Sequence, residues 1–111
     1  MDSNDFISAK DLYKRIQNKE NFVLLDVRTP DEFKRGYIKG AVLLNLSENF
    51  LADLNKIGIS NKKNEPIVVY CRSGSRSQIL YSVLKTLSFT NVKDLEGGLL
   101  SWKKENLPLI I

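Results

Sequence analysis

Residues 66–76 read Pro-Ile-Val-Val-Tyr-Cys-Arg-Ser-Gly-Ser-Arg and carry the clearest structural signal in the chain. The segment from Ile67 to Tyr70 is apolar and rich in β-branched residues, with a proline before it, which is typical of a buried strand. Six mostly polar residues, 71–76, follow without a break. Apolar residues then recur at helical spacing, at Ile79, Leu80, Val83, Leu84 and Leu87. This stretch therefore predicts a buried strand, a tight polar loop and a helix in direct succession.

On either side of this stretch, apolar runs and turn residues alternate in the same way. Strands are predicted over 22–27, 41–45 and 92–95, and helices over 8–19, 30–35, 47–57 and 99–105. Ser8 and Asp11 have the spacing of a capping box, Pro30 favours a helix start, and Ser47 is predicted to cap the third helix. Strands that alternate with helices indicate an α/β fold with a mainly parallel sheet, whose crossover helices cover both faces.

Length and composition indicate one ordinary globular domain over residues 1–111. The hydrophobic fraction is 42% and the charged fraction 27%, which excludes a largely disordered chain. No apolar run approaches the ~18 residues of a membrane span, and the first residues lack the basic and apolar regions of a signal peptide. A single cysteine cannot form an internal disulfide, which favours a reducing, cytoplasmic location.

The chain has no histidine. Its absence excludes histidine as a general base and, with only one cysteine present, argues against a zinc site. We expect neither a metal nor a cofactor. The net charge of +4, from 17 basic and 13 acidic residues, modestly favours anionic partners. Because the lysines are scattered along the chain, nucleic acid is not expected to be the main ligand.

Three short segments directly follow predicted strands: residues 26–28, 71–76 and 96–98. In parallel α/β sheets, ligands bind outside the carboxyl ends of the strands. We therefore expect these segments to meet at one site.

The segment from Cys71 to Arg76 has the features of an anion-binding loop. It lies between a strand and a helix N-terminus, where free backbone N–H groups and the helix dipole favour negative charge. Gly74 permits a positive φ or a close backbone approach, and Arg72 and Arg76 add positive potential. A thiol in this setting has a pKa below its usual ~8.5, so Cys71 is a candidate nucleophile that needs no histidine base. The alternative is that Cys71 is a small buried core residue.

Four segments occur in order along the chain and together carry a resemblance. They are Asp26-Val-Arg-Thr-Pro-Asp-Glu-Phe33, Gly36-Tyr-Ile-Lys-Gly-Ala41, Ile67-Val-Val-Tyr-Cys-Arg-Ser-Gly-Ser-Arg-Ser77, and Leu95-Glu-Gly-Gly98 followed by Trp102. From about Ile7 to Leu107 the chain resembles the rhodanese family of sulfurtransferases, in its single-domain form. The resemblance implies a three-layer fold, with a mainly parallel five-stranded sheet between helices.

The resemblance also implies a chemistry. Cys71 would be the nucleophile that forms a persulfide, taking sulfane sulfur from an anionic donor such as thiosulfate. Cyanide, a thiol or a protein thiol would then accept the sulfur, in ping-pong kinetics. Backbone N–H groups of residues 72–76 would hold the persulfide anion. The reaction implied is that of a thiosulfate sulfurtransferase.

The remaining site residues receive roles from the same comparison. Arg72 would attract the anionic donor, and Arg76 would either bind the donor or brace the loop. Ser73 and Ser75 would either donate hydrogen bonds to the anion or simply suit the turn. Asp26 and Arg28 are assigned structural roles beside the site in preference to substrate contact, and Gly97 and Gly98 a close approach to the cysteine loop. Trp102 is expected in the core.

The chain departs from the family pattern at two positions, and three alternative functions are considered. The family usually has histidine and proline where this chain has Tyr37 and Lys39, which leaves the rigidity of that segment open. Related phosphatases have the longer spacing Cys-x5-Arg, whereas Cys71 and Arg76 have the sulfurtransferase spacing Cys-x4-Arg. This argues against a phosphatase, and the lack of a second cysteine argues against an arsenate reductase with an internal thiol relay. A persulfide carrier that docks on a partner protein in a thiolation pathway is not distinguished from the enzyme.

Overall fold

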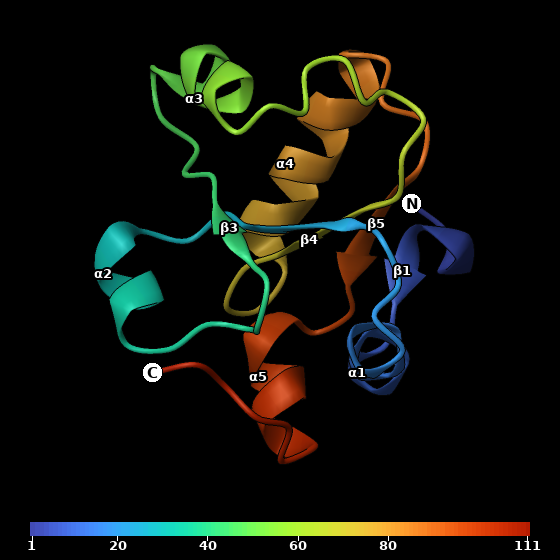
Figure 1. Cartoon of the computed structure of the whole chain (residues 1–111), viewed down its shortest axis with the longest axis vertical. Coiled ribbons are helices and arrows are strands. Elements are labelled where there is room, and N and C mark those ends of the chain that lie inside the picture. Colours follow the sequence, from blue (N-terminus) through green and yellow to red (C-terminus); the bar gives the residue numbers. More distant parts are fainter.

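The computed structural model describes all residues, 1–111, and is built around one sheet of five strands. The strands are β1 (Phe6–Ile7), β2 (Val23–Asp26), β3 (Val42–Leu43), β4 (Ile67–Tyr70) and β5 (Val92–Leu95). Their order is β1-β5-β4-β2-β3, and all neighbouring strands are parallel (Figure 1). The predicted α/β fold and the five-stranded parallel sheet are thereby confirmed. Only β1 was not located from the residues, because a two-residue strand has no readable periodicity.

Helices cover both faces of the sheet. They are α1 (Ala9–Gln17), α2 (Pro30–Lys34), α3 (Phe50–Lys56), α4 (Ser75–Thr86) and α5 (Gly98–Lys104), with a short 3-10 turn, η1, at Ser3–Asp5. Figure 1 shows α3 and α4 on one side of the sheet, α1 and α5 on the other, and α2 beside the edge strand β3. None of these helices has both the length and the apolar character needed to cross a membrane.

The central strand β4 is buried on both faces, as its unbroken apolar run predicted. Ile67 and Val69 pack into the core beneath α3 and α4, whereas Val68 and Tyr70 pack into the core beneath α1 and α5. Trp102 lies in this second core and is buried, as expected. The strand end at Tyr70 is therefore held from both sides, and it delivers the next residue to a defined position.

The predicted caps have mixed outcomes. Ser8 caps α1, its Oγ accepting the backbone N–H of Asp11 at 3.1 Å, but Asp11 does not return the bond that a full capping box needs. The prediction for Ser47 is wrong: α3 begins at Phe50, and the Ser47 hydroxyl instead accepts the backbone N–H of Asn49 at 3.2 Å. Ser47 thus stabilises a turn before the helix, because hydroxyls serve turns and caps alike.

Candidate active site

Cys71 follows β4 directly and is fully buried at the base of the polar loop. The backbone N–H of Gly74 donates to its Sγ at 3.0 Å, and the thiol lies 3.4 Å from the Ser77 hydroxyl oxygen, to which it donates. The Ser77 hydroxyl in turn donates to the Gly74 carbonyl at 3.1 Å. The chain thus curls round the sulfur, and both groups that contact it come from the loop and the first turn of α4.

Gly74 makes this curl possible through its backbone conformation. It is the residue before α4 and has φ of 117° and ψ of −21°, a left-handed geometry that other residues rarely adopt. A Cβ built there would meet nothing closer than the Gln78 side chain at 3.9 Å, so the conformation, and not a lack of space, requires glycine. Gln78 donates the first intrahelical bond, to the Gly74 carbonyl at 3.0 Å. The amides of residues 75–77 therefore have no backbone acceptor and are available to the Cys71 sulfur or to an anion bound beside it.

Hydrogen bonding shifts the thiol toward its ionised form. Burial opposes ionisation, but the Ser77 hydroxyl and the backbone N–H groups of Ser77, Gly74 and Ser73 together outweigh it, so the pKa of Cys71 is lowered. The direction is the one expected from the sequence. The cause differs in one respect, because a serine hydroxyl contributes and no arginine side chain contacts the sulfur.

Of the two glycines expected to lie close to the cysteine loop, Gly98 does so, whereas a Cβ on Gly97 would meet the Ser101 side chain of α5, at 2.8 Å, and not the loop. Leu99 N–H donates to the Cys71 carbonyl at 2.9 Å, and Leu100 N–H to the Arg72 carbonyl at 3.0 Å. A Cβ on Gly98 would lie 2.6 Å from the Arg72 carbonyl oxygen, closer than real Cβ contacts allow. The start of α5 thus holds the backbone of the loop at a distance that only glycine permits.

Asp26 and Arg28 form a buried ion pair after β2. The guanidinium donates twice to the Asp26 carboxylate, at 2.7 and 2.9 Å, and once to the Gly36 carbonyl at 2.7 Å. Burial disfavours the charged guanidinium, but the bonds and charge of Asp26 outweigh this and raise the pKa of Arg28. Both side chains join β2 to the segment after α2, and no hydrogen bond links them to Cys71. The geometry supports the structural role.

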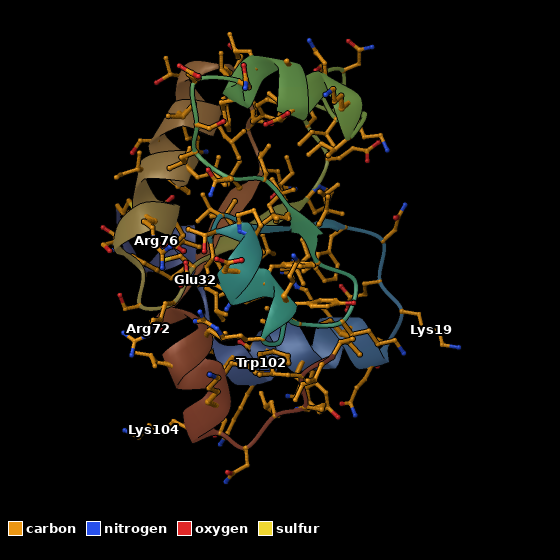
Figure 2. The ribbon with its side chains drawn as sticks, turned by 90° about the vertical axis from the view of Figure 1, so that its left-hand side faces the viewer. Lys19, Glu32, Arg72, Arg76, Trp102 and Lys104 are labelled. Atoms are coloured by element: carbon orange, nitrogen blue, oxygen red, sulfur yellow. The ribbon has the colours of Figure 1, made fainter.

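Arg76 pairs with Glu32 of α2 and not with the sulfur. Its guanidinium contacts the two carboxylate oxygens at 2.6 and 3.0 Å, and Figure 2 shows the two side chains pointing toward each other. The bonds from Arg76 are the main reason why the pKa of Glu32 falls to about 2. Glu32 also completes a capping box with Thr29, accepting its backbone N–H at 3.1 Å. Of the two roles assigned to Arg76, this geometry supports bracing.

A small cationic cavity of about 140 Å³ opens beside the loop. Its charged lining consists of four cations and one carboxylate: Arg28, Arg35, Arg72, Lys103 and Glu32. Arg28 is paired with Asp26 and Glu32 with Arg76, whereas Arg35, Arg72 and Lys103 have no ion-pair partner. Arg72, Ser73 and Ser75 are exposed, so their side chains face solvent at the mouth of the site. The lining fits an anion, in line with the expected role of Arg72. No cluster of three or more His, Cys, Asp or Glu side chains could hold a metal ion.

The two departures from the family pattern lie away from Cys71. Tyr37 stacks on Phe33 with ring centroids 4.2 Å apart, and its backbone exchanges two hydrogen bonds with Ile110. Lys39 is exposed and lines cavities on the side of Ile16 and Gln17. Tyr37 therefore fastens the C-terminal segment to the end of α2, and the segment is tied down without a histidine or proline.

Three residues around the site were not identified from the sequence: Ser77, Glu32 and Asp94. Ser77 is the third residue of α4, where a serine carries no distinctive signal. Glu32 had a readable signal, because Thr29 and Glu32 have the spacing of a capping box. Asp94 is a fully buried carboxyl on β5 without a hydrogen-bond partner, and only a three-dimensional structure could reveal its burial.

The fold and site together define a class of protein: a parallel α/β sheet whose central strand ends in a cysteine within an amide-lined anion loop. The pattern of the rhodanese-like domain matches residues 8–105. A sulfurtransferase of Allochromatium vinosum is 32% identical over 105 residues, which cover 94% of this chain and 92% of that protein. Chloroplastic thiosulfate sulfurtransferase 16 of Arabidopsis thaliana is 34% identical over 91 residues, covering 76% of each chain.

Solved structures agree with these sequence comparisons. The solution structure of a rhodanese-like domain from Anabaena superposes with a TM-score of 0.81 at 27% identity, covering 99% of this chain and 80% of that one. A rhodanese-related protein from Thermoplasma volcanium gives a TM-score of 0.74 at 30% identity, and the match covers 95% of this chain and 96% of that one. The chain belongs to the rhodanese-like domain family and is homologous to sulfurtransferases.

Proposed function

We propose that this protein is a thiosulfate-type sulfurtransferase that carries sulfane sulfur as a persulfide on Cys71. The observation that carries the proposal is the lowered pKa of a lone cysteine, held in a loop of backbone N–H donors beside cations without ion-pair partners. The family supplies the reaction class, and the site supplies the preference for an anionic donor.

In the first half-reaction, the Cys71 thiolate attacks the outer sulfur of thiosulfate. A new S–S bond forms to Cys71, the S–S bond of thiosulfate breaks, and sulfite leaves with the electron pair. The donor is a dianion, and the cavity lined by Arg35, Arg72 and Lys103 would attract it to the mouth of the loop. Because Cys71 is fully buried, we infer that the exposed loop residues move to admit the donor's outer sulfur.

In the second half-reaction, cyanide or a thiolate attacks the outer sulfur of the persulfide. Thiocyanate or an acceptor persulfide leaves, and the Cys71 thiolate is restored. Between the two steps, the terminal sulfur carries a negative charge that the free amides of 75–77 would stabilise. The cycle needs no histidine, because the amides and the Ser77 hydroxyl favour the thiolate directly. A thiol that must return to its reduced state in each cycle fits a reducing compartment such as the cytoplasm.

Intact-mass analysis after thiosulfate treatment tests this function. Under non-reducing conditions, the protein should gain one sulfur, roughly 32 Da, and lose it again on addition of cyanide. Cys71→Ser should show no gain. An unchanged mass for the wild type would overturn the proposal. Comparing the rate of discharge by cyanide with that by protein thiols then separates a small-molecule enzyme from a carrier that serves a partner protein.

A further inference from the structure

Asp94 is a buried carboxyl for which the reaction above has no use. It lies in the middle of the sheet on β5, opposite Val69 of β4 and Phe6 of β1. Its side chain is fully buried, and neither carboxylate oxygen has a hydrogen-bond partner. An unpartnered carboxyl in a sheet interior is costly when ionised, so its presence calls for a physical account.

The neighbour that explains Asp94 is Ser77. Val92, two residues before Asp94 on the same strand, packs in the core beneath α4, so the alternation of a strand places Asp94 on the face that α4 covers (Figure 1). Burial raises the pKa of Asp94 to about 6, and the nearby Ser77 hydroxyl offsets this rise in part. In the sheet register, Asp94 lies opposite Val69, two residues before Cys71, and Val69 and Cys71 belong to the core beneath α4. Asp94 therefore faces the first turn of α4, where Ser77 contacts the Cys71 sulfur.

The Ser77 hydroxyl has one proton to donate and several possible acceptors. In the observed geometry, the Cys71 thiol donates to Ser77 Oγ, and Ser77 donates onward to the Gly74 carbonyl. When Cys71 loses its proton, the sulfur becomes an acceptor, and the Ser77 hydroxyl stabilises it only by turning toward it. Ser77 Oγ then has lone pairs free for a new donor, and a protonated Asp94 is the one acid beside it.

We propose that Asp94 is a positioning residue for Cys71: as the neutral acid, it donates to Ser77 Oγ and turns the Ser77 hydroxyl toward the ionised sulfur. The inference rests on the proposed role of Cys71 as the sulfur carrier. An ionised Asp94 would act in the opposite sense, because it would compete for the Ser77 proton and repel a sulfur anion. Cys71 and Asp94 thus share one proton across Ser77, and they titrate as a coupled pair.

Four charged or titratable side chains near β5 are engaged with other groups, and Glu96, which follows β5, is exposed to solvent. The Tyr81 hydroxyl of α4 donates to the Asp5 carboxylate of η1. The Lys85 ammonium lies over the Tyr81 ring and donates to the Thr90 carbonyl at 3.3 Å. Arg76 at the start of α4 pairs with Glu32, and Lys93 of β5 donates to the Asn4 carbonyl at 2.5 Å. None of them pairs with Asp94, which leaves Ser77 and, through it, Cys71.

Two substitutions of similar size separate a hydrogen bond from the mere removal of a charge. Asp94→Asn keeps a donor that can reach Ser77, whereas Asp94→Leu is equally neutral but has none. Because the chain has one cysteine, its thiolate absorbance in the ultraviolet reports the pKa of Cys71 directly. We expect the thiol of Asp94→Asn to ionise about threefold to tenfold more readily than that of Asp94→Leu. Adding Ser77→Ala to both should abolish the difference.

Equal thiol ionisation in Asp94→Asn and Asp94→Leu would overturn the proposal, as would a difference that persists with Ser77→Ala. If Asp94→Leu does not fold, the Asp94 carboxyl is followed by carbon-13 chemical shift in the wild type and in Cys71→Ser. The carboxyl should titrate at higher pH in the wild type, because a thiolate opposes its ionisation. Identical titrations would contradict the coupling.

These measurements use no sulfur donor, so they are independent of the proposed transfer reaction. If thiosulfate adds no sulfur but the variants behave as expected, the function fails and the positioning stands. If sulfur adds normally and Asp94→Asn and Asp94→Leu are alike, the function stands and the positioning fails.

Discussion

Cys71 shows how a nucleophile is prepared without a general base. Its sulfur contacts only neutral groups: the amide of Gly74 donates to it at 3.0 Å, the thiol donates to the Ser77 hydroxyl at 3.4 Å, and no cation forms a hydrogen bond with it. Neutral dipoles stabilise the Cys71 thiolate, whereas an arginine in contact with the sulfur would also bind the donor anion at that position. The positive side chains stand farther out, where they attract the donor without competing for the sulfur.

This division of labour leads to a prediction for Arg72. Arg72→Ala should lower kcat/KM for thiosulfate about threefold to tenfold, because an exposed arginine contributes through long-range charge. The pKa of Cys71, measured by thiolate absorbance, should change little. Added salt should shrink the difference between variant and wild type, because it screens an exposed charge.

Lys104→Ala is the matched control for Arg72→Ala. It also removes one positive charge, from α5, but Lys104 does not line the cavity beside the loop. Figure 2 shows Lys104 on the part of α5 that lies away from Arg72. Steady-state kinetics at low and high salt should show a smaller effect for Lys104→Ala than for Arg72→Ala. Equal losses in the two variants would assign the effect to net charge and not to the cavity.

At the level of elements, the loop depends on α2 and α5, neither of which contains the nucleophile. Glu32 of α2 holds Arg76 in the first turn of α4, and Gly98 at the start of α5 lies against the Arg72 carbonyl. The loop is therefore fixed at both of its sides by helices that are distant from it in sequence. Each contact can be removed separately.

The Glu32–Arg76 contact should appear in the pH dependence of stability. The pKa of Glu32 is about 2 in the folded protein and 4.5 ordinarily, so the ion pair stabilises the fold above about pH 4.5, and this stabilisation is lost as pH falls toward 2. Glu32→Gln should reduce the free energy of unfolding at neutral pH by about 1 to 2 kcal/mol, after allowance for solvent screening. Urea unfolding from pH 7 to pH 2.5 should show the two proteins converging at low pH, and a constant difference would contradict the assignment.

Gly98 gives a second prediction at this scale. Gly98→Ala should destabilise the protein by about 2 kcal/mol and lower sulfur transfer, because its Cβ would displace the loop backbone. Gly58→Ala is the control: Gly58 also has a positive φ, of 81°, but open space around its Cβ position. Thermal unfolding and thiosulfate kinetics should show strain alone in Gly58→Ala, and strain with lost activity in Gly98→Ala. Unimpaired transfer by Gly98→Ala would show that the loop tolerates the displacement.

For the molecule as a whole, the Asp94 carboxyl buried in the sheet lowers the free energy of unfolding when it is ionised. Its pKa is raised from 3.8 to about 6, so between these pH values the unfolded chain gives up the proton before the folded one does. Stability therefore falls as pH rises through this window, and the loss stays constant above it. This change of stability with pH is opposite in sign to the change caused by Glu32, whose pKa is lowered in the folded protein.

Asp94→Asn should remove this cost. Relative to the wild type, its free energy of unfolding should rise between pH 4 and pH 7, by about 2 to 3 kcal/mol, because an amide has no proton to lose. Denaturant unfolding at several pH values measures the change. A difference between the two proteins that does not vary with pH would show that Asp94 titrates normally in the fold.

Local patterns in the sequence were enough for the architecture. The unbroken apolar run of β4, the alternation of strands with helices and the short connections left a parallel α/β sheet as the consistent arrangement, and the motif around Cys71 marked the loop. These features are readable because strand burial, helix periodicity and turn chemistry act over a few neighbouring residues. Ser47 was misassigned for the same reason, since a hydroxyl before a turn and one before a helix look alike locally.

Contacts between residues distant in sequence decided the rest. Glu32 and Arg76 are 44 residues apart, and nothing in the composition of either segment shows that they pair. The burial of Asp94 beside Ser77 follows from the packing of α4 on β5, and the role of Gly98 from its contact with the Arg72 carbonyl. The sequence identified the nucleophile because its loop is local. Only the folded chain assembled the groups that set its charge, because electrostatics and desolvation depend on distance in space.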